Sequence, residues 1–225
     1  MQLGRRSERF ADRTAAGAAL VAPVTRWLAE HGAGPAGAVP VLVLALPRGG
    51  VPVAVPVARA VRAPLDVLLV RKIGVPGQPE LAMGAVAAVA GAVAGAGEPD
   101  GSGGPAGPTS AAPDDLGVVE VVRNELVLDR LRLPAAVFAD VLDRELTELH
   151  RRMSAYRGDR PPPVSRGRAV VGVDYGLATG STMRAAVAAV RRLGPARVLV
   201  AVPVGAADSC ARLRECPDVD DVLCA

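Results

Sequence analysis

The chain has 225 residues, a formal net charge of +3 and a composition that is half apolar but contains only five aromatic side chains. This length suits one well-buried domain. A charge of +3, without basic stretches interleaved with aromatic residues, excludes nucleic acid as an expected partner. Cys210, Cys216 and Cys224 are odd in number and lack CxxC spacing. We therefore expect neither a disulfide framework nor a zinc site.

The sequence also argues against export or membrane insertion. The charged N-terminus lacks the apolar core of a signal peptide. The uncharged run Leu81–Gly97 is mostly Ala, Gly and Val, and it is too short and too weakly apolar to cross a bilayer. We expect a soluble, reduced, cytoplasmic protein with no membrane partner.

The first part of the chain predicts alternating helices and strands. The run VLVLAL, bounded by Pro40 and Pro47, is typical of a strand buried on both faces. The expected elements are a helix over Thr14–His31, a strand over Val41–Leu46, a helix over Val51–Val61, and strands over Leu65–Val70 and Met83–Val89. Arg71 and Lys72 would then follow directly at the C-terminal end of the strand over Leu65–Val70.

Composition changes over residues 90–115, which are almost wholly Ala, Gly, Pro, Ser and Thr with a few acids. Such a segment cannot bury enough apolar surface to order itself. We therefore expect one domain over residues 1–225, interrupted by a flexible insertion over residues 90–115.

The remainder of the chain repeats the strand and helix order, which predicts a parallel α/β sheet with helices on both faces. The expected elements are a strand over Gly117–Val122, a helix over Pro134–Arg157, a strand over Ala169–Val173, a helix over Ser181–Leu193, a strand over Val198–Val202, a helix over Ala206–Arg214 and a strand from Val222.

Chemistry concentrates in the segment Val170–Thr182. A buried strand delivers Asp174 at its C-terminal edge, where α/β sheets bind ligands. The small and hydroxylated residues Ala178–Thr182 then lead directly into a helix, so that backbone N–H groups and the positive end of the helix dipole face one point. Gly180 lets the backbone approach a phosphate closely. The alternative is a purely structural role, in which the segment is an ordinary strand–turn–helix whose helix is capped by Ser181.

This segment resembles the phosphoribosyl pyrophosphate signature of type I phosphoribosyltransferases, in which a hydrophobic strand is followed by two acids and G-x-A-T-G-[ST]-T. The wider chain resembles a bacterial phosphoribosyltransferase family whose members mostly have no assigned substrate. The further pieces that match, in the family's order, are Phe10–Arg13, Leu46–Pro52, Pro64–Val67, Val70–Gly74, Pro79–Ala82 and Gly84–Val86. The resemblance implies a Rossmann-like type I phosphoribosyltransferase fold.

The resemblance also implies roles for individual residues. The loop Ala178, Thr179, Gly180, Ser181 and Thr182 would bind the 5-phosphate. Asp174, with Tyr175 beside it, would bind the ribose. Arg48, Gly49 and Gly50 would form the pyrophosphate loop, since a Gly-Gly turn exposes N–H groups and the Arg fork suits phosphate oxygens. Arg71 and Lys72, the chain's single Lys, would reach the pyrophosphate from the next strand. Asp174, Arg71 and Lys72 are the candidate catalytic residues.

The implied reaction displaces pyrophosphate from C1 of phosphoribosyl pyrophosphate by a nitrogen acceptor, such as a nucleobase. Such enzymes use Mg²⁺ as cofactor, held through the pyrophosphate and, in this chain, by Asp174 at most. No metal site made directly by several protein ligands is expected. The partners implied are phosphoribosyl pyrophosphate and an unidentified acceptor, and such enzymes are commonly homodimers.

The sequence departs from the family pattern at Tyr175 and at its C-terminal end, and Ala178, which fits the pattern, bears on the acceptor. Tyr175 stands where the family has a second acid, so it brings no negative charge near neutral pH. Ala178 stands where hypoxanthine–guanine enzymes carry an Asp, which argues against a 6-oxopurine acceptor. Family members also continue past the strand that begins at Val222, so we expect a C-terminal truncation.

Two other functions compete with catalysis. A non-catalytic sensor or decayed paralogue would bind phosphoribosyl pyrophosphate or a nucleotide without reaction, and Tyr175 favours this alternative. A dinucleotide-binding Rossmann protein is the weaker alternative, because no G-x-G-x-x-G follows an early strand.

Overall fold

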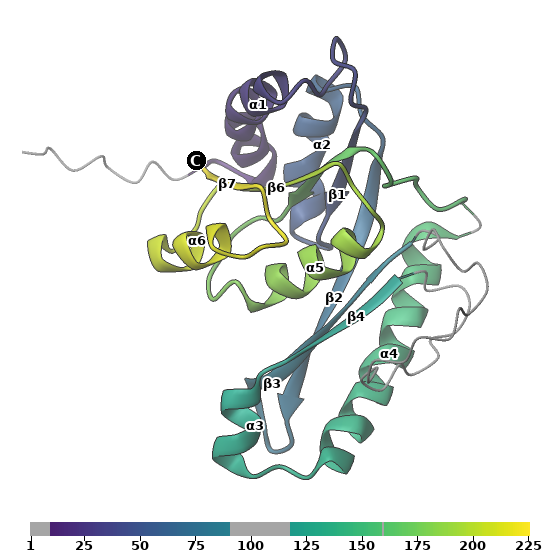
Figure 1. The fold of residues 1–225 in the computed structure, drawn as a ribbon, viewed down its shortest axis with the longest axis vertical. Coiled ribbons are helices and arrows are strands. Elements are labelled where there is room, and N and C mark those ends of the chain that lie inside the picture. The colour runs from purple at the N-terminus through teal and green to yellow at the C-terminus, as the bar shows by residue number, and fades with distance from the viewer. Residues whose placement is uncertain (1–9, 91–117, 159) are drawn as a thin grey trace, which may run out of the picture.

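The computed structural model describes residues 10–90, 118–158 and 160–225. The predicted insertion over residues 90–115 lies outside the described residues, apart from Ala90. The described residues form a seven-stranded sheet in the order β4-β3-β2-β1-β5-β6-β7 (Figure 1). Its strands are β1 (Val41–Ala45), β2 (Leu65–Val75), β3 (Gln78–Val89), β4 (Val118–Arg123), β5 (Ala169–Val173), β6 (Arg197–Val202) and β7 (Asp221–Cys224).

The centre of the sheet is parallel. β1 lies between β2 and β5 and pairs in parallel with both, and β6 and β7 extend the parallel arrangement. Every residue of β1 and of β5 is buried, because their continuous apolar runs meet helices on both faces. The predicted α/β fold, with a parallel sheet covered on both sides, is confirmed.

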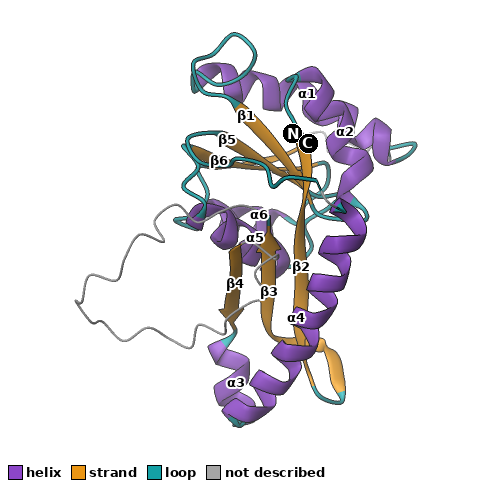
Figure 2. Cartoon of the chain, turned by 90° about the vertical axis from the view of Figure 1, so that its right-hand side faces the viewer, coloured by secondary structure: helices purple, strands orange, loops and turns teal. Residues whose placement is uncertain are grey.

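Helices cover both faces (Figure 2). The helices are α1 (Arg13–Glu30), α2 (Gly50–Ala60), α3 (Glu125–Leu131), α4 (Ala135–Arg157), α5 (Ser181–Arg192) and α6 (Ala207–Arg214). One core joins α1 and α2 to β1, β5 and β6, and a second joins α5 and α6 to the other face. No helix among the described residues is long and apolar enough to span a membrane.

The packing of α1 on α2 is close. α1 begins after Asp12, whose carboxylate accepts a hydrogen bond from the Ala15 N–H at 2.7 Å. At Gly17 an added Cβ would clash with the Val53 carbonyl group. The small residue therefore lets the two helix backbones approach each other on the sheet.

The other edge of the sheet is antiparallel, which the sequence did not predict. β2 pairs antiparallel with β3, and β3 with β4. β2 runs on to Val75, so the prediction that it ends at Val70 is wrong. Arg71 and Lys72 lie inside the strand and pair with Val86 and Ala85. The strand continues because the hairpin partner β3 supplies backbone hydrogen bonds that do not require an apolar sequence.

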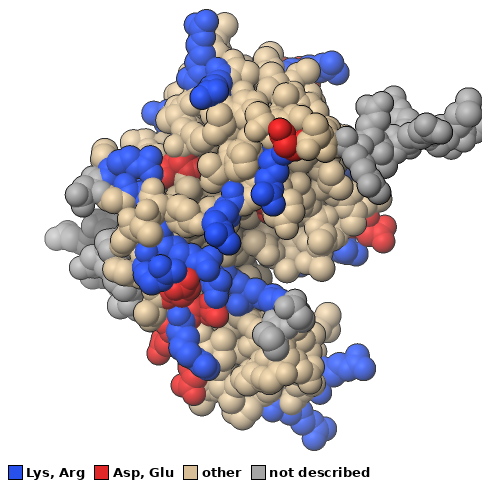
Figure 3. Space-filling model, turned by 180° about the vertical axis from the view of Figure 1, so that it is seen from behind, with Lys and Arg blue, Asp and Glu red and all other residues tan. Residues whose placement is uncertain are grey.

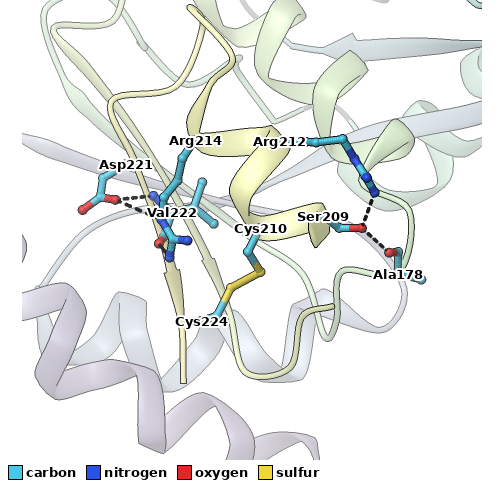
Figure 4. Close-up of a disulfide and its surroundings, with 8 residues drawn as sticks. All are labelled: Ala178, Ser209, Cys210, Arg212, Arg214, Asp221, Val222 and Cys224. Atoms are coloured by element: carbon cyan, nitrogen blue, oxygen red, sulfur yellow. Dashed lines mark hydrogen bonds and ion pairs between the residues drawn. A yellow bond between two sulfur atoms is a disulfide. The ribbon is translucent and has the colours of Figure 1, made fainter. Parts of the chain in front are cut away.

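α3 and a disulfide were also not predicted. α3 is short and packs only Leu128 as a buried residue, so its sequence carries little periodic signal. Cys210 of α6 and Cys224 of β7 form a disulfide, and Cys216 is free (Figure 4). The expectation of no disulfide is therefore wrong, because the packing of α6 beside β7 brings together cysteines 14 residues apart.

Candidate active site

The carboxyl ends of β1 and β5 are adjacent and bring two loops together. Ala45 is the register partner of Val173, and the Leu46 N–H donates to the Val173 carbonyl at 2.9 Å. The turn at residues 47–50 and the segment at residues 174–182 therefore leave neighbouring strands at the same edge of the sheet. Ligands bind at this edge in open α/β sheets.

The turn after β1 offers backbone donors. The Arg48 side chain is exposed, and the Pro47–Arg48 peptide bond is cis. Within the described part of the chain, the backbone N–H groups of Arg48 and Gly49 have no hydrogen-bond acceptor, whereas the Gly50 N–H donates to the Leu46 carbonyl at 2.9 Å. Two unpaired N–H groups beside an arginine suit a phosphate group.

Gly50 is required by the close approach of the two loops. A Cβ at this position would lie 2.7 Å from the Val173 carbonyl oxygen and 3.1 Å from Asp174 Cα. Both contacts are with backbone, which cannot move aside as a side chain can. The Gly-Gly turn therefore sets how near the predicted pyrophosphate loop lies to the predicted ribose-binding carboxylate.

The loop from Leu177 to Thr182 is held in place at its start. Leu177 forms an isolated parallel bridge with Gly205, and its N–H donates to the Val204 carbonyl at 2.8 Å. Gly180 has φ +77°, a left-handed conformation that favours glycine, and α5 begins at the next residue. The loop thus turns sharply into a helix N-terminus.

The loop presents donors to solvent. Ala178, Thr179, Ser181 and Thr182 are exposed, and the Thr179 and Ser181 hydroxyl oxygens are 3.2 Å apart. Across the described ranges, no protein acceptor pairs with the backbone N–H groups of residues 178–180. Unpaired N–H groups, hydroxyls and the positive end of α5 together form an arrangement that can bind an anion.

Sequence reasoning missed two residues that support this loop. The Ser209 hydroxyl donates to the Ala178 carbonyl at 2.5 Å, and Arg212 donates to the Ser209 hydroxyl at 3.2 Å (Figure 4). Both residues belong to α6. Their contact with the loop joins segments about thirty positions apart, so no local motif could have revealed it.

Asp174 lies half-buried at the end of β5. Burial raises the pKa of its carboxyl group to about 6, although the hydrogen bond from the Tyr175 N–H, 2.7 Å long, acts in the opposite direction. A carboxylate with such a pKa is a good acceptor for hydroxyl groups near neutral pH, and it remains close enough to protonation to respond to small changes in pH.

Tyr175 lies against the turn after β1. Its side chain is 55% exposed, yet a Cβ on Gly49 would clash with its ring. The guanidinium carbon of Arg13 lies 5.4 Å from the ring centroid, a cation–π distance. The ring therefore covers Gly49, which belongs to the predicted pyrophosphate loop.

Arg71 and Lys72 lie apart from these loops. The last residue of β2 that pairs with β1 is Val67, and Arg71 is four residues further along, about 13 Å at the usual rise of a strand. Arg71 donates from Nε to Glu145 of α4 at 2.6 Å. Lys72 is exposed, and its side chain leaves the opposite face of β2 because side chains alternate along a strand. Their proposed contacts with pyrophosphate remain predictions.

The residues at this edge of the sheet suit a metal ion that is coordinated mainly by a bound phosphate compound and only to a small extent by protein side chains. In the described ranges, no group of three or more His, Cys, Asp or Glu side chains could hold a metal ion. Asp174 is the carboxylate beside the turn at residues 47–50. Mg²⁺ needs only one or two protein carboxylates when phosphate oxygens and waters complete its shell.

No protein-family model matches the chain. Two proteins of Mycobacterium tuberculosis, each named a "Putative phosphoribosyl transferase" (MT0597 in strain CDC 1551 / Oshkosh and Rv0571c in strain H37Rv), are 41% identical to it over 184 residues. The match covers 82% of this chain and 34% of each relative. The chain thus spans about a third of the length of these curated relatives.

A solved structure, that of TT1426 from Thermus thermophilus, matches over nearly the whole chain. The sequences are 34% identical, the TM-score is 0.66, and the alignment covers 96% of this chain and 84% of that one. The shared fold, the 41% identity to the mycobacterial proteins and the loops at the ends of β1 and β5 agree with one another. The chain is thus similar to two proteins named putative phosphoribosyl transferases, and it shares the fold of TT1426.

Proposed function

We propose that this protein binds 5-phosphoribosyl 1-pyrophosphate and transfers the phosphoribosyl group to a nitrogen acceptor, releasing pyrophosphate. The observation that carries the proposal is the pairing of two donor-rich loops at adjoining strand ends. The loop at residues 178–182 would hold the 5-phosphate, and the turn at residues 48–50 would hold the pyrophosphate. The names of the mycobacterial relatives support the same class of reaction.

The site's residues have distinct parts in this reaction. The bond from C1 of the ribose to the acceptor nitrogen forms, the bond from C1 to the pyrophosphate oxygen breaks, and the acceptor gives up a proton. Positive charge develops on the ribose ring in the transition state, as in glycoside chemistry. The Asp174 carboxylate, in its ionised form, would accept hydrogen bonds from the ribose hydroxyls and stabilise this charge.

The leaving group would be stabilised by the turn after β1. The N–H groups of Arg48 and Gly49 and the Arg48 guanidinium group would hold its oxygens. Mg²⁺, when bound to the pyrophosphate, would neutralise part of its charge, and Asp174 is the residue that would contact the metal. Arg71 and Lys72 lie further along β2 than the end of its pairing with β1. They could therefore contact the pyrophosphate only if this part of β2 moves towards the turn after β1, or if the pyrophosphate extends towards β2.

The acceptor would be a nucleobase or another nitrogen compound. Ala178 offers no carboxylate for proton transfer at the base, so a 6-oxopurine is disfavoured as acceptor. Proton removal would fall to another group or to solvent.

A second function is favoured by one specific observation. The Tyr175 ring covers Gly49 and replaces an acid with an uncharged phenol. This arrangement suits a non-catalytic sensor that keeps the 5-phosphate loop but holds pyrophosphate weakly.

Calorimetric titration and a product assay separate the two functions. We expect phosphoribosyl pyrophosphate with Mg²⁺ to bind the protein, and one base from a panel of purines and pyrimidines to cause pyrophosphate release. Binding without release for any base would support the sensor. No binding at all would contradict both.

A further inference from the structure

A cavity of about 430 Å³ lies between the first turn of α2 and the C-terminal end of α4. The two helices lie on the same face of the sheet (Figure 2). Its lining residues are Ala45, Arg48, Val51, Pro52, Leu65, Asp66, Val67, Tyr156 and Arg160. The loop at residues 174–182 contributes none of them. The cavity is therefore distinct from the proposed phosphate and ribose sites, and Arg48 is the residue it shares with the pyrophosphate turn.

The floor and one wall of the cavity are apolar. Ala45 and Val67 come from paired positions of β1 and β2, and Pro52 belongs to the first turn of α2. The ring of Tyr156, in the last turn of α4, adds an aromatic surface. Surfaces of this kind bind the apolar or aromatic body of a small molecule, and the volume lies in the range of small-molecule sites.

The single acid in the lining is already neutralised. Asp66 accepts a hydrogen bond from Arg157 at 3.2 Å, and the two side chains are 10% and 6% exposed. Arg157 also donates to the carbonyl groups of Arg160 and Pro161. This buried pair fixes the chain beyond α4 against β2, so the cavity wall that Arg160 forms is held in place.

The remaining charges are positive. Arg160 donates to the carbonyl groups of Arg157 and Tyr156, at 3.0 and 2.7 Å, which orient its guanidinium group without neutralising it. Among the described residues, no carboxylate pairs with Arg160 or Arg48. Figure 3 shows the face opposite to that of Figure 1, where Lys and Arg side chains gather with some Asp and Glu side chains among them. An apolar cavity with two guanidinium groups whose positive charge is not neutralised by a described carboxylate suits an anion.

We propose that this cavity binds a small organic anion, whose phosphate or carboxylate group contacts Arg48 and Arg160 and whose apolar or aromatic body lies on the floor. The ligand would affect the neighbouring turn because Arg48 belongs to both sites. An anion that holds Arg48 in the cavity competes with pyrophosphate for the same guanidinium group, so it would weaken phosphoribosyl pyrophosphate binding, and the reverse effect would be equal. This coupling rests on the proposed function, whereas the binding of the anion does not.

Phenyl phosphate, titrated into the full chain and followed by calorimetry, is the probe that combines both features. We expect it to bind more tightly than inorganic phosphate, which lacks the body, and than benzyl alcohol, which lacks the charge. Benzoate in a parallel titration separates a carboxylate from a phosphate as the preferred group. If neither phenyl phosphate nor benzoate binds, or if inorganic phosphate binds as tightly as phenyl phosphate, the proposal is overturned.

Two variants test the location. Arg160→Ala should weaken phenyl phosphate binding by about fivefold or more, because it removes a charge-assisted hydrogen bond. Val67→Phe should have a similar effect by filling the cavity while both arginines remain. The matched control is Arg144→Ala, which removes an exposed arginine of α4 that also donates to a backbone carbonyl but does not line the cavity. Equal weakening by the control would overturn the assignment.

The phosphate loop must be excluded as the binding place of the probe. Ser181→Asp should leave phenyl phosphate binding unchanged while it weakens the binding of phosphoribosyl pyrophosphate by about 100-fold. Arg160→Ala should weaken phenyl phosphate binding and leave the binding of phosphoribosyl pyrophosphate unchanged. If Ser181→Asp abolishes phenyl phosphate binding, the probe occupies the loop and the cavity proposal fails. If phosphoribosyl pyrophosphate does not bind the parent protein but phenyl phosphate does, only the proposed function fails.

Discussion

The two halves of the connection between β5 and α5 differ in the groups that they offer to the proposed phosphoribosyl ligand. The phosphate half, residues 178–182, has exposed hydroxyls, unpaired N–H groups and a glycine at φ +77°. The ribose half has one half-buried carboxylate, Asp174, with Tyr175 in the place of a second acid. In the proposed function, binding of the substrate and chemistry at C1 would therefore depend on neighbouring but separable parts of one loop.

The supports of the two halves differ as well. The phosphate half is supported by α6, where the Ser209 hydroxyl donates to the Ala178 carbonyl and Arg212 donates to the Ser209 hydroxyl. The ribose half contacts the turn after β1 through Gly50 and through the Tyr175 ring. A substitution in one half should thus leave the other largely intact, and the following predictions test this independence.

The largest expected effect is on stability, from Asp174→Asn. The folded pKa of Asp174, about 6, lies above its ordinary value of 3.8, so the folded state binds the proton more tightly than the unfolded state. The parent's free energy of unfolding therefore falls as pH rises from about 4 to about 6. Asn does not titrate, so at pH 7 the variant should be more stable by up to about 3 kcal/mol.

Urea unfolding of parent and variant across pH 4 to 8 measures this difference. The stability gain should shrink towards zero as pH falls to about 4, since the parent carboxyl group is then largely protonated in the folded state and increasingly so in the unfolded state. A gain that stays constant over this range would show that the pKa is not raised.

The next effect concerns the phosphate half. Ser181→Asp adds a negative charge where the 5-phosphate would lie and removes a hydroxyl donor, so it should weaken phosphoribosyl pyrophosphate binding by about 100-fold, or about 2.7 kcal/mol. An acid in the first turn of α5 is favourable for the helix itself, so the fold should be kept. Ser154→Asp, at an exposed position of α4, is the control that should leave the affinity for phosphoribosyl pyrophosphate unchanged. Similar losses in both variants would argue against the loop.

A smaller effect is expected where the two loops meet. Gly50→Ala forces a Cβ against the Val173 carbonyl oxygen and Asp174 Cα, so it should cost about 2 kcal/mol of stability. Gly176→Ala is the matched control in the neighbouring loop, where the nearest atom would be 3.5 Å away. Its cost should be below about 0.5 kcal/mol. Equal melting temperatures for the two variants would contradict the close approach.

The smallest effect tests the ribose half. Tyr175→Asp restores a second acid and uncovers Gly49, so we expect phosphoribosyl pyrophosphate with Mg²⁺ to bind about tenfold more tightly or to turn over faster. Tyr175→Phe keeps the ring over Gly49 and should show no gain. Side-by-side calorimetry of the two variants and the parent measures their affinity for phosphoribosyl pyrophosphate. A Tyr175→Asp variant that shows no gain in affinity or turnover would contradict the interpretation that Tyr175 weakens the ribose half.

Part of the fold and of the site was predictable from local sequence. β1 and β5 are continuous apolar runs bounded by proline, charge or glycine, so their position and their burial on both faces could be predicted. The loop at residues 178–182 follows β5 directly, and its composition alone indicated a turn into a helix. The α4 helix was predicted over nearly its full length from its apolar stripe.

The rest depends on contacts between distant segments. The extension of β2 through Arg71 to Val75 needs the pairing with β3, which its mixed sequence does not signal. The position of Arg71 on the α4 face follows from its ion pair with Glu145, 74 residues away. The Cys210–Cys224 disulfide likewise depends on how α6 and β7 pack. None of these contacts has a local sequence signature.

The claim that the loop at residues 178–182 binds a 5-phosphate is tested most directly with ribose 5-phosphate, which lacks pyrophosphate. Calorimetric titration into the parent and into Ser181→Asp compares the loop with and without an added negative charge. The proposed site predicts saturable binding to the parent and none to the variant. Binding of equal strength to both proteins would contradict it.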